Sequence, residues 1–354
     1  METPLRLTQY SHGGGCGCKI APALLQQILK ELPLLWSDPA LLVGAETSDD
    51  AAVYQLNDEQ ALILTTDFFM PIVDDPVDFG RIAAANALSD VYAMGGRPIL
   101  ALAILGMPVN TLPLSAIREI MAGGIQICQE AGIPLAGGHS IDSPEPIFGL
   151  VAAGLAHPQH IRRNATAQPD DDLILTKPLG IGVMTTALKK GQLSAAGYAE
   201  VLQVMTQLNR IGPQLARRPQ VHALTDVTGF GLLGHLLEVC RGSGVSAELD
   251  LAAIPFLPEA LSLAEAGIFP GAARRNWQGY EGVEADSLPE WQQLLLSDPQ
   301  TSGGLLLAVD PAFTAELLQE LHSAGYSYAR RIGRCQAGEG IAIRVVGEIQ
   351  TPRQ

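Results

Sequence analysis

The sequence predicts an α+β protein of two domains in which mixed sheets pack against helices, and three observations support this. The chain has 354 residues, and at about 150 residues per domain this length gives two domains. Hydrophobic residues make up 47% and charged residues 17% of the chain, a balance that supplies a core and argues against disorder. Hairpin and helix patterns are mixed along the chain, which favours α+β layers over a doubly wound parallel sheet.

The first half begins with a glycine-rich segment and continues with alternating strand and helix patterns. Residues 11–19, SHGGGCGCK, hold four glycines without periodicity and predict a mobile loop. Pro22 then stands where the first turn of a helix tolerates proline. The expected elements are a helix at Ala21–Leu32, a hairpin of Ala51–Leu56 and Ala61–Thr66, a helix at Val77–Met94, a strand at Pro98–Leu105, a helix at Leu114–Ala131, and strands at Pro134–Ala136 and Ile147–Ala156.

The polar stretch at residues 157–172 is the best candidate for a domain boundary, because it ends in three successive aspartates and follows a continuous apolar strand. We therefore expect a mobile loop at 1–20, an N-terminal domain at 21–156 and a C-terminal domain at 157–354. The clearest elements expected after the boundary are strands at Leu173–Lys177, Ser302–Val309 and Ile341–Val346, and helices at Val183–Lys190, Ala199–Ile211 and Ala312–Ala324.

Charge and cysteine content exclude several classes of protein. Asp and Glu outnumber Lys and Arg by 37 to 22, giving a net charge of −15, so we expect neither a general nucleic-acid binder nor a protein that attaches to anionic membranes. The segment Met1–Gln9 lacks the apolar core of a secretion signal, and the apolar stretch Ile147–Ala156 is about half a membrane span. Five cysteines are an odd and sparse set, which favours a reducing cytoplasm.

The first segment that could carry chemistry is Cys16-Gly17-Cys18-Lys19. A nearby ammonium lowers the pKa of a thiol, and Lys19 is close enough in sequence to act in this way on Cys16 or Cys18. The neighbouring glycines let the backbone approach an anion closely. An unstructured tail with two incidental thiols is the plain alternative, but we expect both cysteines to be exposed beside a lysine, which disfavours it. A zinc site is disfavoured because Cys-x-Cys is not the usual spacing and no second pair follows.

The second candidate is a set of aspartates beside turns or strand ends. Asp49 and Asp50 precede a strand, Asp67 ends one, and Asp226 follows a short apolar segment. Most such aspartates cap helices or stabilise turns. Asp90 differs, because it lies inside a helix among apolar residues, where an unpaired carboxylate is costly to bury. Carboxylates without accompanying histidines favour Mg²⁺ and a nucleotide over zinc.

The third candidate is Gly137-Gly138-His139-Ser140, in which two glycines follow a short strand. Backbone amides in such a turn could reach a phosphate or a base. His139 could act as an acid, base or ligand, although a hydrogen-bonded turn histidine is the simpler interpretation. The chain has no nucleophile elbow and no dinucleotide-binding fingerprint in a strand–helix context, which disfavours hydrolases and dehydrogenases.

Seven segments together make the sequence resemble the selenophosphate synthetases, also called selenide, water dikinases. The loop SHGGGCGCK combined with ANALSDVYAMGG is the specific part, whereas the aspartate and glycine segments alone would fit the wider superfamily of aminoimidazole ribonucleotide synthetase-like ATP enzymes. In family order the segments are SHGGGCGCK at 11–19, ETSDDAAVY at 46–54, TTDFFMPIVDDP at 65–76, ANALSDVYAMGG at 85–96, GGHSID at 137–142, LTDVTGFGLLGH at 224–235 and DPQTSGG at 298–304.

The resemblance implies a two-domain fold whose N-terminal domain binds ATP and pairs with a second copy in a homodimer. It implies that ATP, selenide and water give selenophosphate, AMP and phosphate with Mg²⁺. A selenium-delivery protein is a further candidate partner. Carried over residue by residue, Cys16 and Lys19 are catalytic, and Asp50, Asp90 and Asp226 bind the metal. The ATP contacts implied are Lys19, Thr47, Ser48, Asp49, Asp67, Asp90, Gly138, His139 and Ser140.

Three alternatives remain open at the level of sequence. Another ATP enzyme of the same superfamily would share the aspartates but would not need SHGGGCGCK. A redox or metal-binding protein would use Cys16 and Cys18 without turning over a nucleotide. A nucleotide-binding subunit that has lost its activity is disfavoured because Lys19 and the three aspartates expected at the metal are all present.

Overall fold

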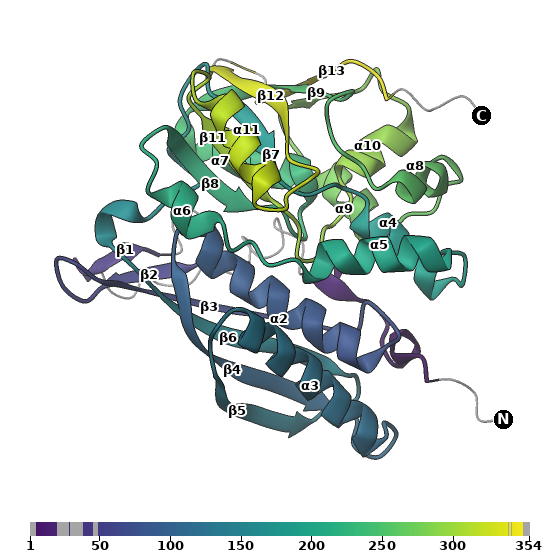
Figure 1. Cartoon of the computed structure of the whole chain (residues 1–354). Helices are drawn as coiled ribbons and strands as arrows, with labels where there is room; N and C mark the ends of the chain where they lie inside the picture. Colours follow the sequence, from purple (N-terminus) through teal and green to yellow (C-terminus); the bar gives the residue numbers. More distant parts are fainter. Residues whose placement is uncertain are drawn as a thin grey trace.

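The computed structural model describes residues 5–19, 28, 38–44, 49–338, 340 and 342–349. Within this part of the chain, the strands form one sheet of six strands and one of seven. Figure 1 shows the two sheets in separate halves of the molecule, with helix α2 (Pro76–Ala93) between them. The helix expected at Ala21–Leu32 lies outside the described residues except for Ile28.

The six-stranded sheet is built from the first half of the chain and has the order β1-β2-β3-β6-β4-β5. Its neighbours pair antiparallel except for β4 and β5, which are parallel, so the sheet is mixed as expected. Its strands are β1 (Leu41–Val43), β2 (Ala52–Gln55), β3 (Ala61–Phe69), β4 (Arg97–Met107), β5 (Leu135–Asp142) and β6 (Ile147–Ala156).

Helices α2 and α3 (Leu114–Glu130) cover one face of this sheet. Asp75 caps α2, since its side chain accepts a hydrogen bond from the amide of Asp78 at 2.9 Å. The two helices approach so closely that only glycine fits at the crossing. A Cβ on Gly80 would stand 1.9 Å from the carbonyl oxygen of Ile120.

The opposite face of the six-stranded sheet is partly apolar and exposed. Along β3, Ala61, Ile63 and Asp67 are buried while Leu64 and Phe68 are 43% and 49% exposed. This alternation follows the two-residue period of a strand. It also places Thr65 and Asp67 on the face that looks toward α2.

The second sheet has the order β10-β13-β9-β12-β7-β11-β8 and is also mixed, because β10, β13 and β9 run parallel while the other neighbours are antiparallel. Helix α7 packs on one face and α6 and α11 on the other, each over its own apolar cluster. The strands are β7 (Asp172–Leu175), β8 (Val221–Asp226), β9 (Val245–Asp250), β10 (Val283–Glu284), β11 (Leu305–Val309), β12 (Arg330–Ala337) and β13 (Ile343–Val346).

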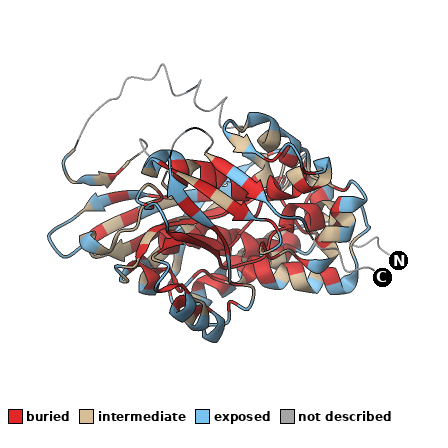
Figure 2. Ribbon diagram, turned by 90° about the horizontal axis from the view of Figure 1, so that it is seen from above, coloured by how far each residue is buried: buried red, intermediate tan, exposed pale blue. Residues whose placement is uncertain are grey.

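The helices of this half surround the sheet and also extend toward α2. Buried residues of α4, α5 and α8 belong to the same apolar cluster as those of α2 and α3. In Figure 2 the buried residues, coloured red, fill the interior of the molecule. These helices are α4 (Ile181–Lys189), α5 (Ala195–Thr206), α6 (Gly212–Ala216), α7 (Gly231–Ser243), α8 (Pro258–Glu265), α9 (Gly271–Gly279), α10 (Glu290–Leu296) and α11 (Thr314–Ser323).

Several expected elements differ from the structure in extent. The strand expected to stop at Thr66 continues to Phe69, so Asp67 lies inside β3. The strand expected at Pro134–Ala136 is β5, which continues through Gly137 and Gly138 because it pairs with β4. The segment at 1–20, expected as a loop, contains two short 3₁₀ helices among its described residues, η1 (Leu7–Tyr10) and η2 (Gly15–Cys18).

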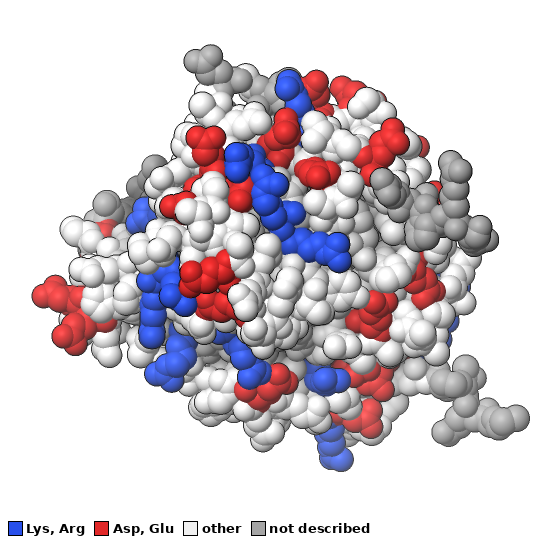
Figure 3. Space-filling model, turned by 45° about the horizontal axis from the view of Figure 1, so that its top comes forward, with Lys and Arg blue, Asp and Glu red and all other residues white. Residues whose placement is uncertain are grey.

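Surface charge is mixed. Figure 3 shows acidic and basic side chains interspersed on one face of the molecule rather than gathered by sign. Among the described residues, no helix combines the length and apolar character needed to cross a membrane.

Candidate active site

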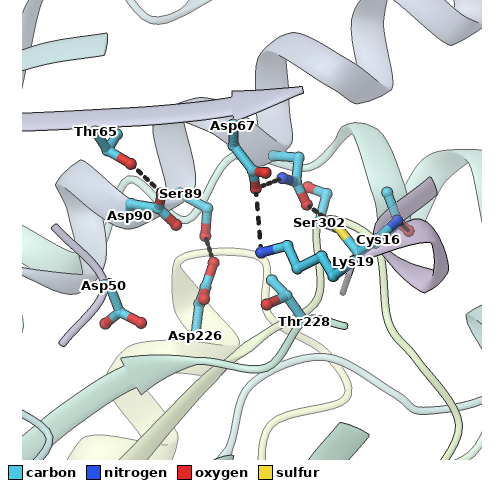
Figure 4. A network of polar contacts seen from close by, with 12 residues as sticks. Cys16, Lys19, Asp50, Thr65, Asp67, Ser89, Asp90, Asp226, Thr228 and Ser302 are labelled. Carbon is cyan, nitrogen blue, oxygen red and sulfur yellow. Dashed lines mark hydrogen bonds and ion pairs between the residues drawn. The ribbon is translucent and has the colours of Figure 1, made fainter. Parts of the chain in front are cut away.

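Four aspartates from separate segments gather where α2 passes between the two sheets (Figure 4). Asp67 comes from β3 and Asp90 from α2, and both face the interior side of the first sheet. Asp226 is the last residue of β8 in the second sheet. Asp50 stands just before β2. The site is therefore shared between the two halves of the chain.

Hydroxyl groups hold three of these carboxylates. Thr65 donates to Asp90 at 2.5 Å, Ser89 donates to Asp226 at 2.5 Å, and Thr225 donates to Oδ1 of Asp50 at 2.8 Å. The second oxygen of Asp50 is buried and has no hydrogen-bond partner. Such an orphaned carboxylate oxygen is costly unless a further ligand completes it.

The electrostatics favour a bound cation. Burial raises the pKa values of Asp50 and Asp90 well above their usual range, and the charge of Asp226 raises them further. Burial also raises the pKa of Asp226. Without a cation, the three carboxylates can be fully ionised at neutral pH only at an energetic cost.

These oxygen donors suit a Mg²⁺ ion that is held partly by water and substrate phosphates better than a metal ion held by protein side chains alone. No three acidic, histidine or cysteine side chains within the described part of the chain form a complete metal-binding group by themselves. Mg²⁺ in proteins is commonly held by one or two carboxylates, with water and substrate phosphates as the other ligands. The oxygen-only donors and the orphaned oxygen of Asp50 suit that arrangement.

Cys16 lies beside the aspartates in η2. It is only 1% exposed, its amide donates to Oγ1 of Thr301 at 3.0 Å, and its thiol donates to Oδ1 of Asn86 at 3.2 Å. Gly14 and Gly15 allow this placement, since a Cβ on Gly14 would stand 2.6 Å from the carbonyl oxygen of Pro71 and Gly15 has a φ of +56°. The expectation that Cys16 is exposed is therefore wrong.

Burial also changes the chemistry expected of the thiol. It raises the pKa of Cys16 far above the usual value, Asp67 raises it further, and Lys19 lowers it only in part. Lys19 lowers the pKa of Cys16, as the sequence led us to expect, but burial and Asp67 outweigh the ammonium, so the pKa is raised overall. In this structure Cys16 is a protonated hydrogen-bond donor.

Lys19 connects the cysteine segment to the carboxylates. Its ammonium lies 3.7 Å from Oδ2 of Asp67. Burial favours the neutral amine, but the charges of Asp67, Asp90 and Asp226 act the other way and raise the pKa of Lys19 overall. Lys19 is therefore a permanent cation that faces the place where the carboxylates meet.

Asn86 is the residue that joins these groups. Its amide nitrogen donates to Asp67, and its carbonyl oxygen accepts both the thiol of Cys16 and the backbone amide of Ser302 at 2.7 Å. Ser302 has an unusual φ of +52°. Asn86 and Asp90 are four residues apart and share one face of the helix, and this spacing was the signal available in the sequence.

Lys177 stabilises the turn at Ser302, which precedes β11. It is 1% exposed and donates to the carbonyl oxygens of Ser302 at 2.8 Å and Gln207 at 2.7 Å. Burial lowers its pKa to about 7. Nothing in the sequence around Lys177 distinguishes it from an exposed lysine at a strand end, so the sequence reading missed it.

Six further residues are expected to contact ATP, namely Thr47, Ser48, Asp49, Gly138, His139 and Ser140. Thr47 and Ser48 fall outside the described residues. Asp49 accepts a hydrogen bond from the amide of Asn164 at 2.8 Å. Gly138, His139 and Ser140 are exposed on the edge strand β5, separated from β3 by β4 and β6, so the structure does not bring them to the aspartates within one chain.

Solved structures share this architecture at low sequence identity. A thiamine-monophosphate kinase from Stenotrophomonas maltophilia K279a matches with a TM-score of 0.62 at 22% identity, covering 94% of this chain and 98% of that one. HypE, from a HypE–HypF complex, matches with a TM-score of 0.65 at 15% identity, covering 92% of this chain and 96% of that one. These similarities establish the fold.

Sequence comparisons are more specific. Residues 48–156 match the family described as AIR synthase related protein, N-terminal domain, and residues 168–346 match the corresponding C-terminal domain. A selenide, water dikinase from Paraburkholderia xenovorans is 59% identical, covering 96% of both chains. One from Dechloromonas aromatica is 57% identical, covering 96% of this chain and 98% of that one. The chain therefore belongs to the selenide, water dikinase family within the AIR synthase-related proteins.

Proposed function

We propose that this chain catalyses the reaction of its family, in which ATP, selenide and water give selenophosphate, AMP and phosphate. The observation that carries the proposal is the meeting of Cys16 and Lys19 with Asp67 and the carboxylates of Asp90 and Asp226. A buried thiol and a protonated ammonium beside a cation site are suited to bring a selenium nucleophile to a phosphoryl group.

Phosphoryl transfer depends mainly on positioning and on neutralising charge. We assign Asp50, Asp90 and Asp226 to hold Mg²⁺, which when bound would neutralise phosphate oxygens. The raised pKa values of Asp50 and Asp90 support this assignment, because a cation would relieve their repulsion. Asp67 and Asn86 orient Lys19 and Cys16 around the same place.

Lys19 and Cys16 have different roles in this scheme. Lys19 stays protonated and stabilises the negative charge on the phosphoryl group. Cys16 orients the selenium species, with its S–H pointing to Asn86 in the resting state. Its small exposed fraction keeps water away from the selenium during the first transfer.

For ATP we propose contacts from Lys19, Asp67 and Asp90 in the cluster, and from six further residues. The latter are Thr47, Ser48, Asp49, Gly138, His139 and Ser140. The exposed position of the last three on β5 is compatible with ATP bound at a subunit boundary, where they would serve the partner's site.

We further propose that the protein is a homodimer joined through the open face of the six-stranded sheet. Tyr54, Leu64, Phe68 and Leu102 are between 37% and 49% exposed there. An apolar sheet face of this kind is unusual on a monomer and is typical of an interface. β5 borders the same sheet, which would bring its residues near the second subunit.

The division into 1–20, 21–156 and 157–354 stays our proposal for the domains, and the separation of β1–β6 from β7–β13 supports it. We propose a cytoplasmic location, which is consistent with all five cysteines being free. A selenium-delivery protein is a candidate partner, since free selenide is reactive.

Nucleotide analysis tests the proposed reaction. The protein is incubated anaerobically with Mg²⁺ and ATP, with and without selenide, and the nucleotides are separated by chromatography. We expect AMP to accumulate only when selenide is present. ADP as the final product, or equal turnover without selenide, would assign the chain to a different ATP-dependent reaction.

A further inference from the structure

Two cavities near Cys16 are lined by residues other than the four aspartates of the site. A pocket of about 640 Å³ lies between η2, α4 and α9. A much smaller cavity of about 10 Å³ lies against Cys16 and Lys19. Gly17, Ala272 and Arg275 line both spaces. These three residues therefore stand between the outer pocket and the inner cavity, and we call them the neck.

The outer pocket is positively charged. Lys189, Lys190 and Arg275 line it, and none of its described lining residues is acidic. Arg275 donates a hydrogen bond to the carbonyl oxygen of Gly17 at 3.2 Å, which fixes its guanidinium at the neck. None of the three cations forms an ion pair with a described carboxylate. The neighbouring Arg274, by contrast, is paired with Glu290.

The neck is also narrow. A Cβ on Gly17 would lie 3.5 Å from the Cβ of Ala272, in ordinary van der Waals contact. The inner cavity has about the volume that holds one water molecule, roughly 10–15 Å³. A small ion would need some movement of the side chains at the neck to reach Cys16, and the inner cavity is too small for a nucleotide.

The two approaches to Cys16 differ in what they attract. The side with Asp50, Asp67, Asp90 and Asp226 is suited to a cation and to phosphates carried by that cation. Selenide is a small monoanion in neutral water, and both the carboxylates and the phosphates of ATP repel it. The outer pocket has the opposite charge, and the neck separates it from the cavity beside the same thiol.

We propose that the outer pocket binds hydrogen selenide and that Arg275 draws this anion through the neck to Cys16. This inference rests on the proposed function, because it concerns the selenium substrate of that site. It gives the two substrates separate entrances, so that ATP can be bound first without blocking the selenium.

Steady-state kinetics provide the first test. Arg275→Met removes the charge and keeps the length of the side chain, Arg275→Lys restores a charge, and Arg274→Met on the same helix is the matched control. Loss of about 1 kcal/mol of attraction predicts an increase of about fivefold in KM for selenide. KM for ATP stays unchanged, and the control and Arg275→Lys remain close to wild type.

Thiol alkylation provides a second test that does not require turnover. In a Cys18→Ser background, the rate of Cys16 modification is measured by mass spectrometry with anionic iodoacetate and neutral iodoacetamide. The ratio of the two rates falls in Arg275→Met and not in Arg274→Met, because only the anion depends on the charge at the neck.

The outcomes separate this inference from the proposed function. An unchanged KM for selenide together with an unchanged alkylation ratio in Arg275→Met overturns the proposal that selenide enters through the outer pocket. Wild-type protein that makes no selenide-dependent AMP overturns the proposed function instead, and the alkylation ratio then still decides whether the neck selects anions. Arg275 is exposed on α9, and circular dichroism verifies that the variants fold.

Discussion

The thiol of Cys16 lies 3.2 Å from Oδ1 of Asn86, although 70 positions separate the two residues. The same oxygen accepts the amide of Ser302, while the Asn86 amide donates to Asp67. One side chain on α2 thus holds the cysteine segment, the turn before β11 and a site carboxylate in a fixed arrangement. Its removal should disturb catalysis more than folding.

Asn86→Leu should lower kcat by about 100-fold or more, since misplacement of a reacting group commonly has an effect of that size. The substitution leaves the thiol and Asp67 without their partner, a loss of about 1–3 kcal/mol in stability. Selenide-dependent AMP formation and thermal unfolding measure the two effects. A variant with wild-type kcat would show that Asn86 has no positioning role.

Asp90→Asn should separate metal binding from folding. Because burial and Asp226 raise the pKa of Asp90 well above its usual range, loss of its charge should leave the metal-free protein at least as stable as wild type at pH 7.5. The increase in Tm produced by Mg²⁺ and ATP should be greatly reduced. Differential scanning fluorimetry measures both quantities.

Glu265→Gln, an exposed substitution at the end of α8, is the control for Asp90→Asn and should keep the full increase in Tm. If Asp90→Asn also keeps it, Asp90 is not part of the metal site.

Lys19→Met should reduce kcat strongly, whereas Lys19→Arg should retain part of the activity because a cation remains near Asp67. The pKa of Lys19 is raised by its acidic surroundings despite burial, so loss of its proton should not shape the pH–rate profile below pH 10. Rates measured from pH 6 to 9 check this. A Lys19→Met enzyme with normal kcat would contradict the assigned role.

Asp298 should make stability depend on pH. Burial raises its pKa to about 7, so the folded state holds a proton that the unfolded state releases above about pH 4. Stability from this group is therefore greatest below pH 4 and is lost as pH rises to 7. Denaturant unfolding should show that Asp298→Asn weakens this decline; an unchanged pH dependence would contradict it.

Phe68→Glu should weaken the proposed dimer, because Phe68 is 49% exposed on the open sheet face. The control is Val346→Glu, which alters an exposed apolar residue of the other sheet, 37% exposed. Sedimentation velocity should show more monomer only for Phe68→Glu. A wild-type monomer, or equal effects of both variants, would contradict an interface on this face.

Local patterns predicted the long, regular elements well. The strand at Ile147–Ala156 has the expected limits, and the helix expected at Val77–Met94 is α2, shifted by one residue at each end. Pairing between strands is a long-range effect, so the extension of β3 past Asp67 and of β5 through Gly138 was not visible in the local sequence.

For the site, the sequence supplied residue types and the resemblance supplied roles. The sequence could not show that Cys16 is buried, because its burial depends on contacts with Asn86 and Thr301, which are 70 and 285 positions away. The roles of Lys177 and Ser302 were missed for the same reason, because their contacts also join segments that are far apart in the sequence. Burial, rather than the neighbouring lysine, then determines the direction of the pKa shift of the thiol.

Phosphorus NMR of the anaerobic reaction with Mg²⁺, ATP and selenide tests most directly that Cys16 and the carboxylate site together make selenophosphate. Wild-type protein should give AMP, phosphate and a new signal with selenium–phosphorus coupling, while folded Cys16→Ser should give no such signal. A selenium–phosphorus signal of equal intensity from Cys16→Ser, or none from the wild type, would contradict it.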